Sequence, residues 1–180
     1  MLGSKYDSCM ADAAKLKSDP VTGPLLANTS QEQVAAMIGY TSSDYQILNA
    51  ALRSKDPVEL ARLKPYIDNA NAGLASLPNY SGPVYRGIDS TRMPPDVVAQ
   101  YLKPGEVITE RAYVSTSYVA GANFPGDLQL TVMSKTGKQI DFLSMYAGEK
   151  EVLFAPGTSF KVLSVTDIGG GKKSIKLMEM

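Results

Sequence analysis

The stretch A-Y-V-S-T-S-Y, residues 112–118, decides which fold class the sequence favours. In an extended chain its hydroxyl groups alternate, so that Ser115 and Ser117 share one face and Thr116 lies on the other. Aromatic and β-branched residues flank them, as is typical of strands. Similar short runs, separated by turn residues, continue from Gly82 to the end of the chain. We therefore expect strands at 84–86, 107–109, 112–118, 128–133, 140–142, 151–154, 159–166 and 174–178, one helix at 94–102, and a hairpin turn at Gly169-Gly170-Gly171.

The first eighty residues carry a helical pattern instead. The run S-Q-E-Q, which starts at Ser30, is a capping box in front of apolar residues at helical spacing. The run D-P-V-E, which starts at Asp56, supplies an N-cap, a proline suited to the first helical position and an acidic first turn. We expect helices at 30–40, 43–53, 56–64 and 66–77, the last between Pro65 and Pro78. Helices followed by strands predict an α+β fold with an antiparallel or mixed sheet, in a single domain over residues 1–180.

Composition excludes several classes of catalytic site. The chain has no histidine and one cysteine, so a Ser-His-Asp triad, a Cys-His pair, an imidazole zinc site and an internal disulfide are ruled out. The phosphate-binding loop G-x-x-x-x-G-K-[ST] and the dinucleotide turn G-x-G-x-x-G are also missing. Eighteen basic residues balance eighteen acidic ones, and we expect neither a nucleic-acid nor a membrane partner. Carboxylates must therefore perform any acid–base chemistry.

Three short motifs combine groups that bind phosphate with groups that stabilise positive charge. Arg86 ends a predicted strand in front of Gly87; a guanidinium binds phosphate oxygens in pairs, and glycine lets a ligand approach the backbone. The hydroxyls of the S-T-S run at 115–117 can hold a carboxylate by hydrogen bonding. Glu149 and Glu151 project to the same side of an extended chain, where two like charges are tolerated on a solvated rim or beside a cationic ligand. Each motif alone is more typical of an ordinary strand or strand end than of a functional site.

Together and in this order, Arg86, the S-T-S run and the E-x-E pair resemble the R-S-E class of ADP-ribosyltransferases, which includes actin-modifying binary toxins and injected bacterial effectors. The resemblance covers about residues 48–165, and the E-x-E pair is similar to the branch that modifies arginine. It implies N-terminal helices packed on a split pair of mixed or antiparallel sheets that bind NAD+ without a Rossmann turn. It also implies transfer of ADP-ribose from NAD+ to a protein arginine, without a metal.

The resemblance gives individual residues roles. Arg86 is expected to hold an NAD+ phosphate, and the Gly87 backbone to bond the nicotinamide carboxamide. Ser115 is expected to orient Glu151, which holds the 2'-hydroxyl of the nicotinamide ribose and stabilises the oxocarbenium-like sugar as nicotinamide leaves. Glu149 is expected to bind or deprotonate the acceptor arginine. Further residues expected at the NAD+ site are Tyr85, Thr116, Ser117 and Phe124, and Tyr146 is expected to recognise the target protein.

One departure from the family concerns the second phosphate contact. Binary toxins also carry a basic residue on the loop after S-T-S, whereas residues 118–128 here contain neither lysine nor arginine. That contact is therefore unassigned: either NAD+ binds weakly, or a different arginine or lysine, such as Arg92 or Arg111, supplies it. Phe124 also has an alternative interpretation, as a core aromatic side chain.

The target and the route to it stay open. The run Y-A-G-E-K-E-V-L at 146–153 resembles the recognition loop of actin-modifying toxins, so actin is the target we expect first. Alternatives are small GTPases, ribosomal or cell-division proteins of a competing bacterium, and RNA polymerase. The first residues lack a signal-peptide pattern, which fits a toxin or effector that is secreted or injected and acts in the target-cell cytoplasm. An immunity protein or a chaperone would be a further partner. Competing functions are an NAD+ glycohydrolase on the same fold and a catalytically silent binding module.

Overall fold

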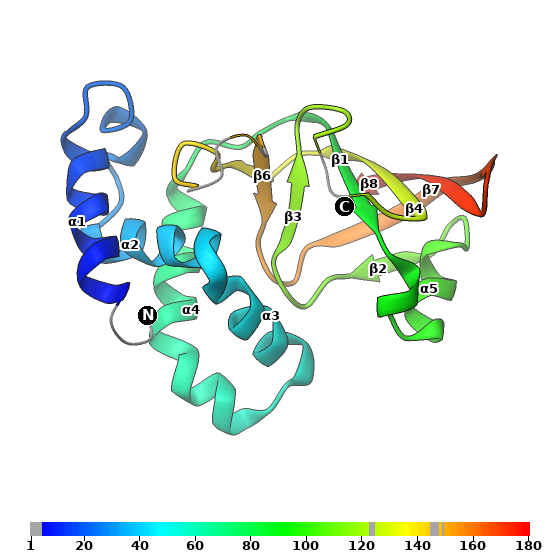
Figure 1. Ribbon diagram of the computed structural model, residues 1–180, viewed down its shortest axis with the longest axis horizontal. Helices are drawn as coiled ribbons and strands as arrows, with labels where there is room; N and C mark the ends of the chain where they lie inside the picture. Colours follow the sequence, from blue (N-terminus) through cyan, green and yellow to red (C-terminus); the bar gives the residue numbers. More distant parts are fainter. Residues whose placement is uncertain (1–4, 123–124, 145–147, 149) are drawn as a thin grey trace. The chain divides into compact units, whose positions relative to one another are not determined.

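The computed structural model describes residues 5–122, 125–144, 148 and 150–180 (Figure 1). The chain forms two compact units: residues 1–78 with 138–147, and residues 79–137 with 148–180. The first break, after Pro78, lies where the sequence pattern changes from helical to strand-like. The expectation of one domain over the whole chain stays a prediction. Within the described ranges no helix is long and apolar enough to cross a membrane.

The first unit is helical. It contains α1 (Lys5–Ser18), η1 (Pro24–Leu26), α2 (Gln31–Gly39), the π-helical turn η2 (Tyr40–Asp44), α3 (Tyr45–Ser54) and α4 (Pro57–Ser76), and the two-residue strand β5 (Lys138–Gln139) belongs to it. Helix α2 packs against both α1 and α4 (Figure 1). Gly73 of α4 permits this close packing, because a β-carbon there would lie 3.1 Å from the Gln33 carbonyl oxygen.

Both predicted helix N-caps are confirmed. The Ser30 hydroxyl accepts a hydrogen bond from the Gln33 backbone at 3.2 Å, and the Gln33 side chain accepts one from the Ser30 backbone at 2.9 Å. Asp56 accepts from the backbone of Val58 at 2.9 Å. These bonds satisfy N–H groups that have no partner within the first turn of a helix, and so they fix where α2 and α4 begin.

One expectation about the helices was wrong, and one helix was not predicted. The helices expected at 56–64 and 66–77 are one helix, α4, with Pro65 inside it. A proline removes one backbone donor, but Leu63, Tyr66 and Ile67 on either side of it are buried, and this packing outweighs the lost hydrogen bond. Helix α1 was not predicted, because it buries little more than Cys9 and Ala13 and so has weak apolar periodicity.

The second unit is built on a mixed sheet. It contains β1 (Gly82–Ile88), η3 (Ser90–Arg92), α5 (Pro95–Tyr101), β2 (Val107–Thr109), β3 (Val114–Ser117), β4 (Leu128–Ser134), β6 (Glu151–Phe154), β7 (Ser159–Gly169) and β8 (Lys172–Glu179). The strands are neighbours in the order β2-β7-β8-β4-β1-β3-β6. Strands β4 and β8 run parallel, and the other described pairs are antiparallel. The predicted α+β fold with a mixed sheet is confirmed.

The sheet nearly divides between β1 and β3. These strands share a single register pair, Tyr85 with Ser117, whereas β1 and β4 pair along their whole length. The expected split pair of sheets corresponds to the strands on the two sides of this junction, β2-β7-β8-β4-β1 and β3-β6. The hairpin turn at Gly169-Gly170-Gly171 is confirmed, and all three glycines have positive φ. The strand expected at 140–142 is wrong: Ile140 is buried and begins a turn in which the Leu143 backbone donates to its carbonyl at 2.8 Å.

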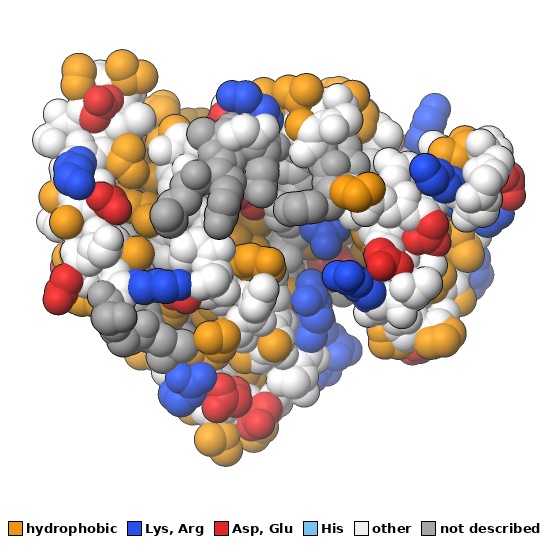
Figure 2. All heavy atoms as spheres, in the orientation of Figure 1, with side chains coloured by type: hydrophobic (Ala, Val, Ile, Leu, Met, Phe, Trp, Pro, Cys, Tyr) orange, Lys and Arg blue, Asp and Glu red, His pale blue; other side chains and the backbone are white. Residues whose placement is uncertain are grey.

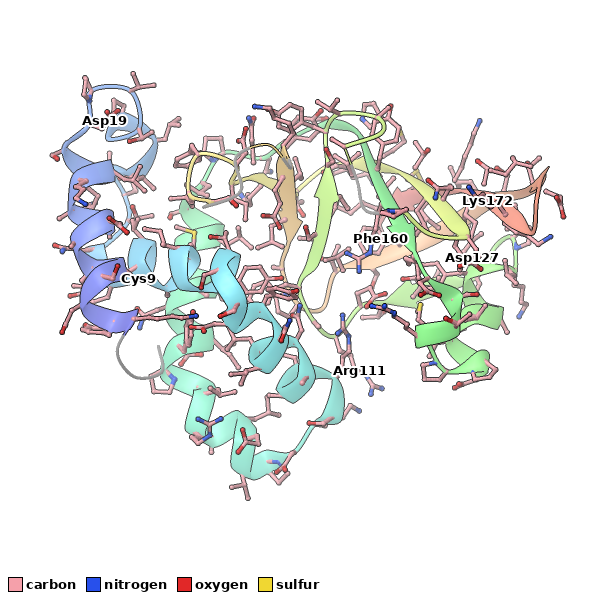
Figure 3. The ribbon with its side chains drawn as sticks, in the orientation of Figure 1. Cys9, Asp19, Arg111, Asp127, Phe160 and Lys172 are labelled. Carbon is pink, nitrogen blue, oxygen red and sulfur yellow. The ribbon has the colours of Figure 1, made fainter. Side chains whose placement is uncertain are left out.

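The core of the second unit lies on one face of the sheet. Val84, Val132, Leu177 and Val162 form a row across β1, β4, β8 and β7, and each is 2% exposed or less. In the same core the rings of Phe154 on β6 and Phe160 on β7 meet edge to face with centroids 5.1 Å apart (Phe160 is labelled in Figure 3). The face of the molecule drawn in Figure 2 carries charged side chains of both signs, in agreement with the balanced composition.

Candidate active site

The S-T-S run occupies β3, between the strands that carry Arg86 and Glu151. Ser117 is the register partner of Tyr85 on β1 and of Glu151 on β6. Directly opposed residues project from the same face of a sheet. Tyr85, Ser117 and Glu151 therefore form one row across β1, β3 and β6. These three strands lie side by side in Figure 1.

Glu151 is a buried carboxylate at the first position of β6. It is 5% exposed, and its register partner Ser117 is 2% exposed. Charges act more strongly when water is excluded, so this carboxylate can stabilise a cation placed beside it. The residue before it, Lys150, has a φ of 51°, a left-handed conformation uncommon for lysine, and its carbonyl accepts a hydrogen bond from Tyr118 at 3.0 Å. Nothing in the sequence indicated this conformation.

The three residues of the S-T-S run lie in different environments. Ser115 pairs with Leu153 and shares the face of Ser117, so it lies diagonally across from Glu151. The Ser117 hydroxyl accepts a hydrogen bond from the Val119 backbone at 3.2 Å. Thr116 projects from the opposite face, where its hydroxyl donates to the Val152 carbonyl at 2.7 Å. The two serines thus share the Glu151 face, while Thr116 ties β3 to β6.

Arg86 is half-buried on β1 and reaches towards β3. Its guanidinium donates from one terminal nitrogen to the Ser115 carbonyl at 2.6 Å. In the part of the chain that the structure describes, the Ser115 carbonyl is the hydrogen-bond partner of the Arg86 guanidinium. The remaining N–H groups of the guanidinium can bind an anion. Gly87 follows, half-buried, and pairs with Gln129 of β4. The structure therefore brings Arg86 and Gly87 to the strand that adjoins the S-T-S run.

Arg92 and Arg111, the candidates for the second phosphate contact, lie outside that row. Arg86 is not part of it either, because it follows Tyr85 on β1 and projects from the other face of the strand. Arg92 has an 85% exposed side chain and forms an ion pair with Asp89 at 3.2 Å. Arg111 is exposed and precedes β3 (Figure 3). The loop that carries Arg92 is fixed by Asp127, which accepts hydrogen bonds from the Ser90 hydroxyl at 2.6 Å and the Ser90 backbone at 2.7 Å. These bonds lower the pKa of Asp127, the side-chain bond contributing most.

Three of the predicted residues, Glu149, Tyr146 and Phe124, lie outside the described residues, and their expected roles stay predictions. Among the residues that are described, no group of three histidine, cysteine, aspartate or glutamate side chains gathers as metal ligands do.

Comparison with known proteins identifies the family. A sequence model described as ADP-ribosyltransferase exoenzyme matches residues 10–180. The chain belongs to this ADP-ribosyltransferase exoenzyme family, and the resemblance seen in the three motifs is confirmed over a longer stretch than they span.

Two relatives and one solved structure are among the most similar. The Mav protein of Mycobacterium avium (strain 104) is 40% identical over 155 residues, which cover 82% of this chain and 18% of Mav. The NAD(+)–protein-arginine ADP-ribosyltransferase Tre1 of Pseudomonas putida (strain GB-1) is 38% identical over 154 residues, 84% of this chain and 29% of Tre1. The chain thus spans less than a third of either relative. The type III effector XopAI of Xanthomonas axonopodis pv. citri has the same fold, with a TM-score of 0.80 and 24% identity over 98% of this chain and 77% of XopAI.

Proposed function

We propose that this chain is the catalytic domain of an NAD+–protein-arginine mono-ADP-ribosyltransferase from a bacterial toxin or effector. The observation that carries the proposal is the buried Glu151 carboxylate, which begins β6 directly opposite Ser117 and shares its row with Tyr85. Membership of the ADP-ribosyltransferase exoenzyme family supports it, as does the similarity to Tre1, which is named as an NAD(+)–protein-arginine ADP-ribosyltransferase.

The reaction breaks the bond between nicotinamide and the ribose carbon C1', and the bonding electrons leave with nicotinamide. The sugar then carries positive charge in an oxocarbenium-like transition state. Glu151 holds the 2'-hydroxyl of this ribose and stabilises the charge, and Ser115 orients the carboxylate. Burial strengthens this electrostatic effect, and it supports Glu151 as the carboxylate beside the sugar.

The NAD+ site is proposed along β1 and β3. Arg86 holds a phosphate with the N–H groups that the Ser115 carbonyl does not occupy, and the Gly87 backbone bonds the nicotinamide carboxamide. Tyr85, Ser117 and Phe124 complete the site. Thr116 is proposed there as well; its hydroxyl donates to the Val152 carbonyl and so also holds β3 and β6 together.

Glu149 is proposed to bind the acceptor arginine and to take a proton from it. A protonated guanidinium is a poor nucleophile, so a carboxylate is needed to position it and to receive the proton as a guanidino nitrogen attacks C1'. This single displacement inverts the configuration at C1'. Tyr146 is proposed to contact the target protein.

Actin is the target we propose first, on the resemblance of residues 146–153 to the recognition loop of actin-modifying toxins. Delivery by secretion or injection, with action in the target-cell cytoplasm, is proposed from the likeness to XopAI, whose fold this chain shares and which is a type III effector. An immunity protein or chaperone is proposed as a further partner.

The test is incubation of the purified chain with NAD+ and agmatine, a small guanidine acceptor, while nicotinamide release and ADP-ribosyl-agmatine are measured together. Both products in comparable amounts would support the proposal. Nicotinamide release without transfer would identify a glycohydrolase, and neither product would identify a silent binding module. Labelled NAD+ in a lysate, with mass spectrometry of the labelled band, then tests actin against other targets.

A further inference from the structure

Glu179 is a buried carboxylate that the proposed chemistry does not use. It is 2% exposed and lies at the end of β8. Its Oε2 accepts hydrogen bonds from the backbone N–H groups of Lys135 at 2.5 Å and Thr136 at 2.9 Å, and its Oε1 accepts one from the Thr136 hydroxyl. Burial of a carboxylate is costly unless donors compensate it. Because three donors from Lys135 and Thr136 bind this one carboxylate, Glu179 fixes the position of the backbone segment that contains them.

That segment is the turn of residues 134–137, which begins at the last residue of β4. The Ser134 hydroxyl donates to the Tyr80 carbonyl at 2.9 Å and accepts from the Gly137 backbone at 3.2 Å. The Tyr80 backbone in turn donates to the Gly137 carbonyl at 2.7 Å. The turn is thus fixed to β8 through Glu179 and to the segment before β1 through Tyr80.

The same turn packs against β6, the strand that begins with Glu151. A β-carbon on Gly137 would lie 2.7 Å from Val152 Cγ1 and 3.0 Å from Phe154 Cε1, so the bare backbone of the turn contacts both core-facing side chains of β6. Val152 directly follows Glu151, and its carbonyl is held by Thr116 of β3. Strand β6 therefore lies between β3 at its edge and the 134–137 turn on its core face.

We propose that Glu179 is a positioning residue for Glu151. By fixing the 134–137 turn, it sets where β6 lies and so where the Glu151 carboxylate stands relative to the reacting sugar. The proposal rests on the catalytic role proposed for Glu151, and it gives Glu179 no contact with substrate. A displacement well below a strand spacing is enough to lower the rate, because transition-state contacts depend steeply on geometry. NAD+ affinity should change little, because Arg86 and Gly87 lie on β1, which pairs with β4 along its whole length and so keeps its place when only the turn shifts.

Two substitutions of Glu179 separate its hydrogen bonds from its charge. In Glu179→Gln the amide oxygen can accept both backbone N–H groups and the amide nitrogen can donate to the Thr136 hydroxyl, so the turn keeps its bonds. Glu179→Met keeps a similar length but removes the acceptors. We expect kcat for nicotinamide release to fall about tenfold in Glu179→Met, with KM for NAD+ within about twofold of wild type. Glu179→Gln should restore most of kcat.

Gly137→Ala tests the same path from its other end, because it keeps the Glu179 side chain but places a β-carbon 2.7 Å from both Val152 Cγ1 and Ser134 Oγ, so the turn and β6 must shift relative to each other. It should also lower kcat more than it changes KM. The matched control is Asp167→Asn, which breaks an exposed ion pair with Lys173 on the β7–β8 hairpin and does not touch the turn; it should keep wild-type kcat.

All rates are measured well below each variant's own unfolding midpoint. A wild-type chain that releases no nicotinamide would refute the proposed function itself. If wild type is active but Glu179→Met and Gly137→Ala keep its kcat, or if KM alone changes, the positioning role is refuted. Equal losses in Glu179→Gln and Glu179→Met would also refute it. If Glu179→Met does not fold, kcat is compared between Gly137→Ala and Glu179→Gln. A lower kcat in Gly137→Ala alone supports the positioning role, and any other pattern refutes it.

Discussion

Ser117 of β3 and Glu151 of β6 stand directly opposite each other, and both are almost completely buried. Opposed β-carbons in an antiparallel pair lie about 4.5–5.5 Å apart, whereas diagonal neighbours are about 7–8 Å apart. Ser115 is such a diagonal neighbour of Glu151 on the same face. The carboxylate can therefore be reached by a nearer and a farther hydroxyl from one strand.

Ser115→Ala and Ser117→Ala should each lower kcat for nicotinamide release. A hydrogen bond to a charged group contributes about 1.5–3 kcal/mol, which corresponds to a loss of roughly tenfold or more. Steady-state rates of both variants would be compared with Thr109→Val, which removes an exposed hydroxyl that pairs with Ser159 on the edge of the sheet. Wild-type kcat in both serine variants would exclude hydroxyl support of Glu151; an effect of only one would identify the orienting serine.

Arg86→Lys should weaken NAD+ binding. Lysine keeps the charge but loses the planar guanidinium, which bonds the Ser115 carbonyl and still offers N–H groups to a phosphate. Calorimetric titration with NAD+ should show at least about a tenfold rise in Kd, the effect of losing one charge-assisted bond. Arg92→Lys, at an 85% exposed side chain, is the comparison. A larger rise in Kd for Arg92→Lys than for Arg86→Lys would assign the phosphate contact to Arg92 instead of Arg86.

Ser90→Ala should make folding stability less dependent on acid pH. Hydrogen bonds from Ser90 hold the pKa of Asp127 below its ordinary value. A carboxyl whose pKa is lower in the folded state stabilises that state above its unfolded pKa, and this stabilisation is lost as the pH falls through the folded pKa. The variant should therefore unfold at a lower temperature than wild type near neutral pH, and the difference should shrink below about pH 4. A difference that stays constant over that range would contradict this account.

Glu149→Gln should separate the two activities. If Glu149 serves only the acceptor guanidinium, the variant should lose nearly all transfer to arginine yet keep the slow hydrolysis of NAD+, because the sugar cation still forms beside Glu151 and water can trap it. Nicotinamide and ADP-ribosyl-arginine would be measured in one reaction mixture. Parallel loss of both products would show that Glu149 shapes the NAD+ site, and loss of neither would remove it from the mechanism.

The sequence predicted those features that depend on local chemistry. The N-caps at Ser30 and Asp56 and the glycine hairpin at 169–171 are confirmed, because each depends on residues a few positions apart. The break expected at Pro65 is wrong because burial on both sides of the proline, a tertiary effect, outweighs its local preference. The strand expected at 140–142 fails similarly, since apolar Ile140 is buried in a turn.

The arrangement of the candidate site could be predicted only in part. Its residue types and order were visible as motifs. The opposition of Ser117 and Glu151 was not, because register depends on which strands pair, and a shift of one residue would place the carboxylate on the other face. No sequence pattern indicated a role for Glu179, because a glutamate near the end of a polar strand is ordinary. Its role depends on the hydrogen bonds from the turn at 134–137, which is distant in sequence.

The most direct test of the central claim is nicotinamide release by Glu151→Gln, which keeps the shape of the side chain and removes its charge. Loss of an electrostatic stabiliser typically lowers a rate by about 10²-fold or more. We predict a loss of at least this size in both NAD+ hydrolysis and arginine transfer, with NAD+ affinity by calorimetry and the thermal unfolding midpoint close to wild type. A variant that keeps most of its nicotinamide release would show that Glu151 is not the carboxylate that stabilises the sugar cation.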